Sequence, residues 1–363
     1  MKKIIKLFDP MFDQKEQSAI QNVLKSKFWA SGSGSGKVLE FENKFKKYTG
    51  TKECIAVNSG TAALHLALSV LDIKNKEVIL PSLSFVSTAN AVLYNGGKPV
   101  FVDVDPKTLC IDPEQIRKKI TKKTSAVMPV HFGGFPANLK EINSICSKNN
   151  LHLIEDAAHA SGSSYQNKKI GSNGEFVCFS FHPVKNLAMP TGGAITINSK
   201  FHKKFTDVLK AARWCGITKR HGFNYDVKEI GWNYYMNEFS AAIGIAQLKK
   251  LNLMNSIRTK IAKVFSNELS VESKIPFSKD CAYHLFWIQV KNRNLFIKNM
   301  KDNNIEVGIH YKPIHKMSLY NSKVKLPITE KISKNIVSLP IHPNLTEYDV
   351  DKIVTFTNRF YNL

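Results

Sequence analysis

The segment LHLIED, residues Leu151–Asp156, indicates which fold this sequence adopts. It is a short apolar run that follows a segment of helical spacing, Leu139–Lys148, and ends in two acidic residues. A run of this length is typical of a strand buried on both faces. The same alternation of an apolar run and a helix-spaced segment extends back to residue 54. Because parallel strands are joined by crossover helices, this alternation predicts a mostly parallel sheet covered on both faces.

Seven such runs predict the strands of one sheet in an α/β fold. They are Cys54–Asn58, Val78–Pro81, Val100–Val104, Ala126–Val130, Leu151–Glu155, Phe176–Phe181 and Ala194–Ile197. The helices expected in this half are Thr61–Leu71, Ser87–Tyr94, Pro113–Ile120 and Leu139–Lys148, with another at Phe239–Leu251. Beyond it we expect a smaller α+β unit made of strand His284–Val290, helix Leu295–Asn303 and strand Glu306–Ile309. The predicted domains are therefore a large one over residues 1–250 and a small C-terminal one over residues 251–363.

The composition indicates a folded chain without membrane spans. Of its 363 residues, 43% are hydrophobic and 22% are charged, which is typical of globular proteins. No apolar run approaches the roughly 18 residues of a membrane span, and the start MKKIIK lacks the apolar core of a signal peptide. We therefore expect a cytoplasmic protein with no membrane partner. The six cysteines show no C-x-x-C or metal-ligand spacing, so we expect them to be reduced and mostly buried, with no metal site.

The chain is strongly basic, with a formal net charge of +23. Almost all of the excess comes from 46 lysines spread over the whole length, against 6 arginines. We favour the interpretation that these are solvated lysines on ordinary surfaces. The alternative is a field that attracts anionic substrates such as nucleotides. No basic stretch is interleaved with aromatic residues, so we expect no nucleic-acid partner.

The loop SGSGSGK, residues 31–37, superficially suggests a phosphate-binding loop. That motif needs glycine, four residues and then Gly-Lys-Ser/Thr, directly after a strand. Here Ser31 occupies the first position, Val38 follows the lysine, and the preceding segment Lys15–Lys25 has helical spacing. We therefore reject that function and expect a flexible turn.

Three other segments carry side chains suited to one kind of chemistry. The segment NSGTAA, residues 58–63, lies between a strand and a helix, and small residues at a helix start let backbone N–H groups approach a phosphate; ordinary helix capping is the alternative. Asp156 ends a strand, where open α/β sheets bind ligands, although it would also suit a helix N-cap. Lys185 follows a later strand in an apolar context with Pro183. Burial there would lower its pKa and make the amine a nucleophile.

Together these are the parts of a pyridoxal phosphate site. The helix start holds the phosphate, the aspartate keeps the ring nitrogen protonated, and the lysine bonds to the cofactor. Phe85, at the end of a strand, is placed to cover the face of the ring.

Seven segments, in order along the chain, extend this interpretation to a family. They are Gly60–Leu64, Pro99–Asp105, Pro129–Gly134, Glu155–Ala160, Phe179–Asn186, Gly231–Glu238 and Leu339–Pro343. Through them nearly the whole chain resembles the DegT/DnrJ/EryC1/StrS sugar aminotransferases. The resemblance implies the aspartate-aminotransferase-like fold (fold type I) and a cofactor, pyridoxal 5'-phosphate, that cycles through pyridoxamine 5'-phosphate.

The resemblance also implies roles for individual residues. Lys185 would bind the cofactor and carry the proton of the reaction, and Asp156 would pair with the ring nitrogen. Phe85 would stack on the ring, and His159 would lie near its face or its phenolic oxygen. The phosphate would be held by Gly60, Thr61, Ala62 and Ser180. Asn233 would reach the phosphate in the neighbouring subunit, which implies a homodimer with shared active sites.

Residues that contact substrate are harder to assign. The segment Gly308–His315 resembles the part of the small domain that closes over the active site, so His310, Tyr311 and His315 are candidates; a strand and turn with solvated histidines is the alternative. Arg213 and Arg220 are candidates for holding the carboxylate of the amino donor, because guanidinium binds carboxylate through two bonds.

One segment departs from the family. After the lysine, members often have Thr-Thr-Gly-Glu-Gly-Gly, whereas this chain has LAMPTGG at residues 187–193. The missing glutamate and the added Met-Pro indicate a subgroup with an altered substrate pocket.

The expected function is transfer of an amino group from an amino acid, glutamate by the resemblance, to a keto-sugar. By the resemblance the sugar is nucleotide-linked and the product serves amino-sugar and surface polysaccharide synthesis. One alternative is a sugar acid of the keto-octulosonate type as acceptor. Another is a sugar dehydratase, but those enzymes replace the cofactor-binding lysine with histidine, and Lys185 is present. A non-catalytic regulator on the same fold would not need both Asp156 and Lys185.

Overall fold

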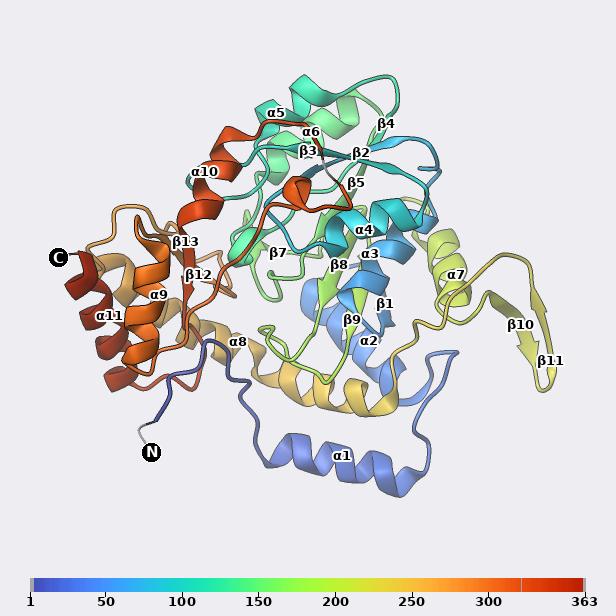
Figure 1. The fold of residues 1–363 in the computed structure, drawn as a ribbon. Coiled ribbons are helices and arrows are strands. Elements are labelled where there is room, and N and C mark those ends of the chain that lie inside the picture. Colours follow the sequence, from blue (N-terminus) through green and yellow to red (C-terminus); the bar gives the residue numbers. More distant parts are fainter. Residues whose placement is uncertain (1–2, 321, 362–363) are drawn as a thin grey trace.

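The computed structural model describes residues 3–320 and 322–361 (Figure 1). Seven strands form one sheet in the order β1-β9-β8-β5-β4-β2-β3. Their bounds are β1 Glu53–Val57, β2 Glu77–Pro81, β3 Lys98–Val102, β4 Thr124–Val127, β5 His152–Asp156, β8 Phe176–Ser180 and β9 Gly193–Ile197. β9 is antiparallel to both of its neighbours, and the pairs from β8 through to β3 are parallel. The prediction of a mostly parallel, seven-stranded sheet is confirmed.

Both faces of this sheet are buried, which explains why its strands are continuous apolar runs. Side chains alternate between the two faces along a strand. In β1, Ile55 and Val57 pack into a core shared with α3 (Gly60–Ser69) and α4 (Ser87–Tyr94). Ala56, between them, packs into a second core with α2 (Gly36–Thr49). The other helices of the large unit are α1 Gln14–Ser26, α5 Pro113–Lys119, α6 Leu139–Lys148 and α7 His202–Ala212.

The C-terminal unit is built on a small antiparallel sheet. Strand β12 (Phe286–Gln289) pairs with β13 (Ile336–Leu339). Its helices are α9 Arg293–Asp302, α10 Pro327–Asn335 and α11 Glu347–Tyr361. Figure 1 shows the long helix α8 (Glu238–Glu268) extending from below the large sheet to this unit.

Helix α8 is longer than the sequence predicted. The expected helix ended at Leu251, but α8 continues to Glu268, so the expected domain boundary at residue 250 lies inside it. Its first half packs into the core of the large sheet through Leu248, and its second half packs with the C-terminal core through Phe265. We propose that α8 belongs to both units and joins them.

The predicted strand at Glu306–Ile309 is wrong. Gly308 forms an isolated bridge with Ser338 of β13, and the N–H of Glu306 donates to the carbonyl of Ile5 at 2.9 Å. A segment that makes only isolated bridges, to two different partners, forms no ladder, so it is not a strand.

Two hairpins were not predicted. Strands β6 (Ser164–Tyr165) and β7 (Lys168–Lys169) form the first, and β10 (Ile217–His221) with β11 (Asn224–Val227) form the second. The second hairpin projects from the large unit at the right of Figure 1. All residues of β11 are exposed, so the alternation of buried and exposed positions that identifies a strand is missing there.

The segment at residues 31–37, expected to be a flexible turn, is anchored by two distant residues. Arg213 donates to the carbonyl of Ser33 at 3.1 Å. The carboxylate of Glu238 accepts the N–H of Lys37 at 2.6 Å, which caps the start of α2. The helix α1 precedes this segment, so the rejection of a phosphate-binding loop is confirmed.

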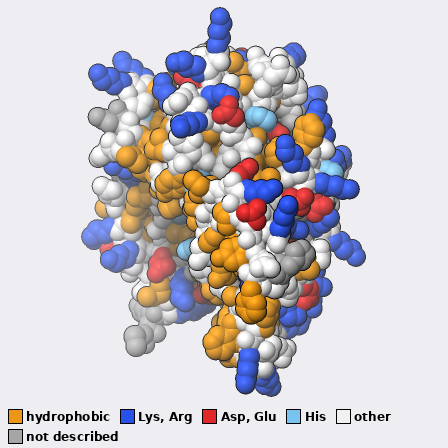
Figure 2. All heavy atoms as spheres, turned by 90° about the vertical axis from the view of Figure 1, so that its right-hand side faces the viewer, with side chains coloured by type: hydrophobic (Ala, Val, Ile, Leu, Met, Phe, Trp, Pro, Cys, Tyr) orange, Lys and Arg blue, Asp and Glu red, His pale blue; other side chains and the backbone are white. Residues whose placement is uncertain are grey.

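The surface agrees with the interpretation of the lysines as solvated. Figure 2 shows basic side chains distributed over one face, with hydrophobic side chains between them. All six cysteines are free, and all except Cys215 are buried. Within residues 3–320 and 322–361, no helix is long and apolar enough to cross a membrane.

Candidate active site

A cavity of about 370 Å³ opens at the carboxyl ends of the parallel strands, beside the C-terminal unit. Both Asp156 and Lys185 line it. Around them lie Phe8, Asn58, Ser59, Gly60, Thr61, Leu64, Ser84, Phe85, Ser87, Val130, Ala158, His159, Ser180, His182, Val184, Thr191, Gly192, His284, His310 and Tyr311. The sheet topology explains this convergence, because parallel strands deliver the loops at their carboxyl ends to one edge.

Asp156 is the last residue of β5 and is only 4% exposed. One carboxylate oxygen accepts the hydroxyl of Thr88 at 2.8 Å, and the other accepts the N–H of Ala158 at 3.1 Å. Burial raises the pKa of this carboxyl, while these two hydrogen bonds and the nearby Lys185 oppose the rise. The next regular element after β5 is strand β6, so the alternative of a helix N-cap does not apply.

Lys185 lies in the loop between β8 and β9 and has its amine 3.4 Å from Nε2 of His284. Burial lowers its pKa to about 8, and Asp156 partly offsets that effect. The prediction of a lowered pKa at this lysine is therefore confirmed. A lysine with this pKa is a neutral amine for part of the time near neutral pH, which makes it a nucleophile.

The start of α3 forms a cradle for an anion. The first N–H groups of a helix have no partner within it. Ser59 accepts the N–H groups of Ala62 and Ala63 at 3.1 and 3.0 Å, which leaves those of Gly60 and Thr61 at the cavity wall. A Cβ on Gly60 would lie 2.7 Å from Cβ of Ser180. Only glycine therefore lets the cradle approach Ser180 this closely, and such a helix start suits a phosphate. Ala62, expected to bind the phosphate, has its N–H bonded to Ser59.

His159 and Tyr311 form a hydrogen-bonded pair on the cavity wall. The N–H of Gly133 donates to Nδ1 of His159 at 3.2 Å, so the proton of the neutral ring resides on Nε2. That Nε2 then donates to the hydroxyl of Tyr311 at 3.1 Å. Burial keeps the pKa of His159 well below its usual value. Phe85, 57% exposed, also lines the cavity, with its ring centre 6.1 Å from that of Tyr311.

Two arginine candidates lie away from this cavity. Arg213 is completely buried, forms an ion pair with Glu42 and donates to the carbonyl of Ala56 at 2.9 Å. Arg220 is on the exposed hairpin, with its guanidinium 4.8 Å from the ring of Trp214. Neither residue is among those that line the cavity.

His315 and Asn233 are also outside the cavity wall. His315 is buried, and its Nδ1 is 2.6 Å from the hydroxyl of Ser82, while its Nε2 lies 3.3 Å from Glu330. Asn233 is exposed and forms a bridge with Trp214. An exposed position is compatible with a contact across a subunit interface.

Sequence reasoning missed several residues of the site. Thr88 lies inside α4 and bonds to Asp156, and nothing in its segment indicates that. His284 is the first residue of a predicted strand and lies just before the observed strand β12, and Phe8 comes from the N-terminal segment. The only signal was the position of His284 at the start of a predicted strand.

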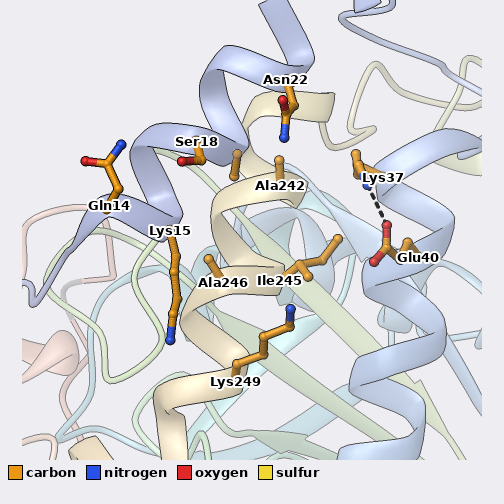
Figure 3. A pocket seen from close by; sticks show the side chains of 11 residues that line it. Gln14, Lys15, Ser18, Asn22, Lys37, Glu40, Ala242, Ile245, Ala246 and Lys249 are labelled. Atoms are coloured by element: carbon orange, nitrogen blue, oxygen red, sulfur yellow. Dashed lines mark hydrogen bonds and ion pairs between the residues drawn. The ribbon is translucent and has the colours of Figure 1, made fainter.

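A second cavity, of about 390 Å³, lies between α1, α2 and α8 (Figure 3). Ala242, Ile245 and Ala246 form its apolar side, and the ion pair of Lys37 and Glu40, at 2.8 Å, lies on its α2 side. Its lining contains no cysteine or histidine, and its one carboxylate is already paired. Among the residues that the structure describes, no cluster of histidine, cysteine, aspartate or glutamate is arranged to hold a metal ion.

The donor set of the first cavity fits pyridoxal phosphate. It combines an anion cradle, a buried carboxylate, an amine of lowered pKa and an aromatic side chain. The gap at Gly60, which a Cβ would fill, lies between the cradle and Ser180.

Comparisons with known proteins agree with this fit. The model of the DegT/DnrJ/EryC1/StrS aminotransferase family matches residues 10–357. The protein MJ1066 of Methanocaldococcus jannaschii is 36% identical over 96% of this chain and 95% of its own length. The structure of PseC from Helicobacter pylori, an aminotransferase involved in the biosynthesis of pseudoaminic acid, is 28% identical. It superposes with a TM-score of 0.92 over 99% of this chain and all of its own. Spr1654 from Streptococcus pneumoniae, a putative sugar aminotransferase solved in its PMP form, has the same fold at 24% identity. Its TM-score is 0.93, over 99% of each chain.

Proposed function

Because this chain belongs to the DegT/DnrJ/EryC1/StrS aminotransferase family, we propose that it moves the amino group of glutamate onto a nucleotide-linked keto-sugar. The chain is a pyridoxal-phosphate-dependent sugar aminotransferase with the aspartate-aminotransferase-like fold, and its cofactor cycles between the pyridoxal and pyridoxamine forms. What we propose beyond the family is the identity of the amino donor, of the nucleotide and of the sugar. We further propose that the enzyme acts in the cytoplasm, as a homodimer, in making amino sugars for surface polysaccharide.

One observation carries the proposed roles of the site residues: Asp156, at the end of β5, and Lys185, in the loop between β8 and β9, line the same cavity. When bound there, pyridoxal phosphate would supply an electron sink for the substrate carbon. Asp156 would hold a proton on the ring nitrogen, and Gly60, Thr61 and Ser180 would hold the phosphate. Lys185, with its lowered pKa, would take a proton from the donor and return it to the acceptor near neutral pH.

The net charge of +23 favours the approach of an anionic acceptor. A nucleotide-linked sugar and a sugar acid are both anionic, so the charge supports either of these acceptors.

We propose Asn233 as a contact to the cofactor phosphate of the partner subunit, which is consistent with its exposed position. The substrate roles of His310 and Tyr311 rest on their place in the cavity wall. Substrate roles for Arg213, Arg220 and His315 are also part of the proposal, although in this structure their side chains contact other residues.

The test follows the two halves of the reaction by absorbance. Full-length protein loaded with pyridoxal phosphate is expected to absorb at about 420 nm, and glutamate should bleach that band. The pyridoxamine form is then offered keto-sugar nucleotides and keto-octulosonate-type sugar acids, with Lys185→Ala protein as the control. Absence of the band would refute the cofactor site. A band that glutamate leaves unchanged would refute glutamate as the donor. Amination of sugar acids but not of sugar nucleotides would show that the acceptor is a sugar acid. Loss of a hydroxyl group from the sugar, without amination, would identify a dehydratase.

A further inference from the structure

The N-terminal segment, residues 5–9, is attached to the C-terminal unit and borders the cavity. The N–H of Ile5 donates to the carbonyl of Asn304 at 2.9 Å. The N–H of Leu7 donates to Glu306 at 3.1 Å, and Nε2 of His342 lies 3.0 Å from the carbonyl of Lys6. These bonds fix the backbone that precedes Phe8, and on its other side Nδ2 of Asn344 donates to the carbonyl of Asp9 at 3.4 Å. The side chain of Phe8 lines the cavity.

The ring of Phe8 packs on two histidines of the cavity wall. It stacks on His284 with ring centres 5.5 Å apart and planes within 16°. It meets His310 edge-on at 5.9 Å. Because a stacked ring restricts rotation of the imidazole, Phe8 fixes the direction in which Nε2 of His284 points.

Nε2 of His284 faces the amine of Lys185. The two nitrogens are 3.4 Å apart, and His284 is only 3% exposed. Burial, together with the neighbouring Lys185, His159, His310 and Arg258, holds the pKa of His284 well below its usual value. A neutral imidazole offers a lone pair to an ammonium group, so Lys185 donates and His284 accepts.

We propose that His284 and Phe8 are positioning residues for Lys185: Phe8 holds the imidazole, and the imidazole accepts a hydrogen bond that orients the amine and stabilises its protonated form. This inference rests on the proposed function for its catalytic meaning, but the hydrogen bond itself is a property of the chain. The other titratable groups that act on this amine are Asp156, His159, His182 and His310. Asp156 stabilises the ammonium form, and the three histidines would oppose it when protonated.

The test measures the protonation of Lys185 directly, in full-length protein free of cofactor. Competitive labelling with acetic anhydride over a pH series, followed by mass spectrometry of the Lys185 peptide, gives the pH at which half of the amine is reactive. His284→Phe keeps the aromatic stack but removes the acceptor, so the midpoint is expected to fall by about one pH unit. His284→Gln restores an acceptor at similar reach and should return the midpoint most of the way.

Phe8→Leu tests the positioning. Phe8→Leu should lower the labelling midpoint of Lys185 by less than His284→Phe does. In a protein that already carries His284→Phe, it should cause no further fall. Phe223→Leu, a substitution of a fully exposed phenylalanine on the β10–β11 hairpin, is the matched control and should change nothing.

Unfolding cannot imitate the expected result. A lysine released into water has a pKa of about 10.4, so a misfolded variant shows a raised midpoint. An unchanged or raised midpoint in folded His284→Phe protein would overturn the inference, as would an additive effect of Phe8→Leu. Failure of the native enzyme to react with glutamate would refute the proposed function and leave the labelling result intact.

Discussion

The substitution Thr88→Val tests the environment of Asp156 through a residue that is completely buried. The Thr88 hydroxyl donates to the carboxylate at 2.8 Å, and valine keeps the shape of the side chain but loses this bond. A hydrogen bond to a charged group contributes about 1.5–3 kcal/mol, and one between neutral groups about 0.5–1.5 kcal/mol. The substitution should therefore lower the free energy of unfolding by about 2 kcal/mol at neutral pH, where the carboxylate is ionised.

The effect should depend on pH in a defined direction. Burial already raises the pKa of Asp156, and loss of the Thr88 bond removes a cause that lowers it, so the pKa in the variant is higher still. The deficit in stability is complete above the folded-state pKa and shrinks as the pH falls through it, because the protonated carboxyl depends less on the bond.

Urea unfolding followed by circular dichroism, at neutral and at mildly acidic pH, measures this difference. Ser84→Ala is the matched control, since it removes the 2.7 Å bond between Ser84 and Thr88 and leaves the bond to Asp156 in place. Its effect on unfolding should be the same at both pH values. A Thr88→Val deficit that does not change with pH would refute the reasoning.

Three further predictions follow from the same contacts. Arg213→Met should lower the free energy of unfolding by about 3–5 kcal/mol, because it leaves the buried carboxylate of Glu42 without its cation. A rise in KM for glutamate with an unchanged free energy of unfolding would instead support a contact between Arg213 and the donor. Gly60→Ala should weaken binding of pyridoxal phosphate at least tenfold by absorbance titration, because its Cβ would lie 2.7 Å from Cβ of Ser180; unchanged affinity would contradict the proposed cradle. Mixing inactive Asn233→Ala and Lys185→Ala chains should restore activity through one competent site per mixed dimer, and mixtures that stay inactive would count against shared sites.

Much of the large sheet could be predicted because its strands are buried on both faces and therefore appear as continuous apolar runs. The convergence of residues at the strand ends could be predicted from the topology, because the carboxyl ends of parallel strands lie at one edge of the sheet. Asp156 and Lys185 lie in one cavity for that reason.

The remaining features depend on contacts between distant segments. The second half of α8 continues the helical spacing, but its buried face includes Arg258, a charged residue that interrupts the apolar pattern. The segment around Glu306 bonds to Ile5, about 300 positions away. Phe8 reaches the cavity, and Thr88 reaches Asp156, only through tertiary packing, which neither periodicity nor a local motif indicates.

The central claim is that one lysine among 46 is the attachment point of the cofactor. Full-length protein loaded with pyridoxal phosphate is reduced with borohydride, digested and examined by mass spectrometry. The account predicts a pyridoxyl group on the peptide that contains Lys185, and its loss in Lys185→Ala protein. A pyridoxyl group distributed over surface lysines, with Lys185 unmodified, would contradict it.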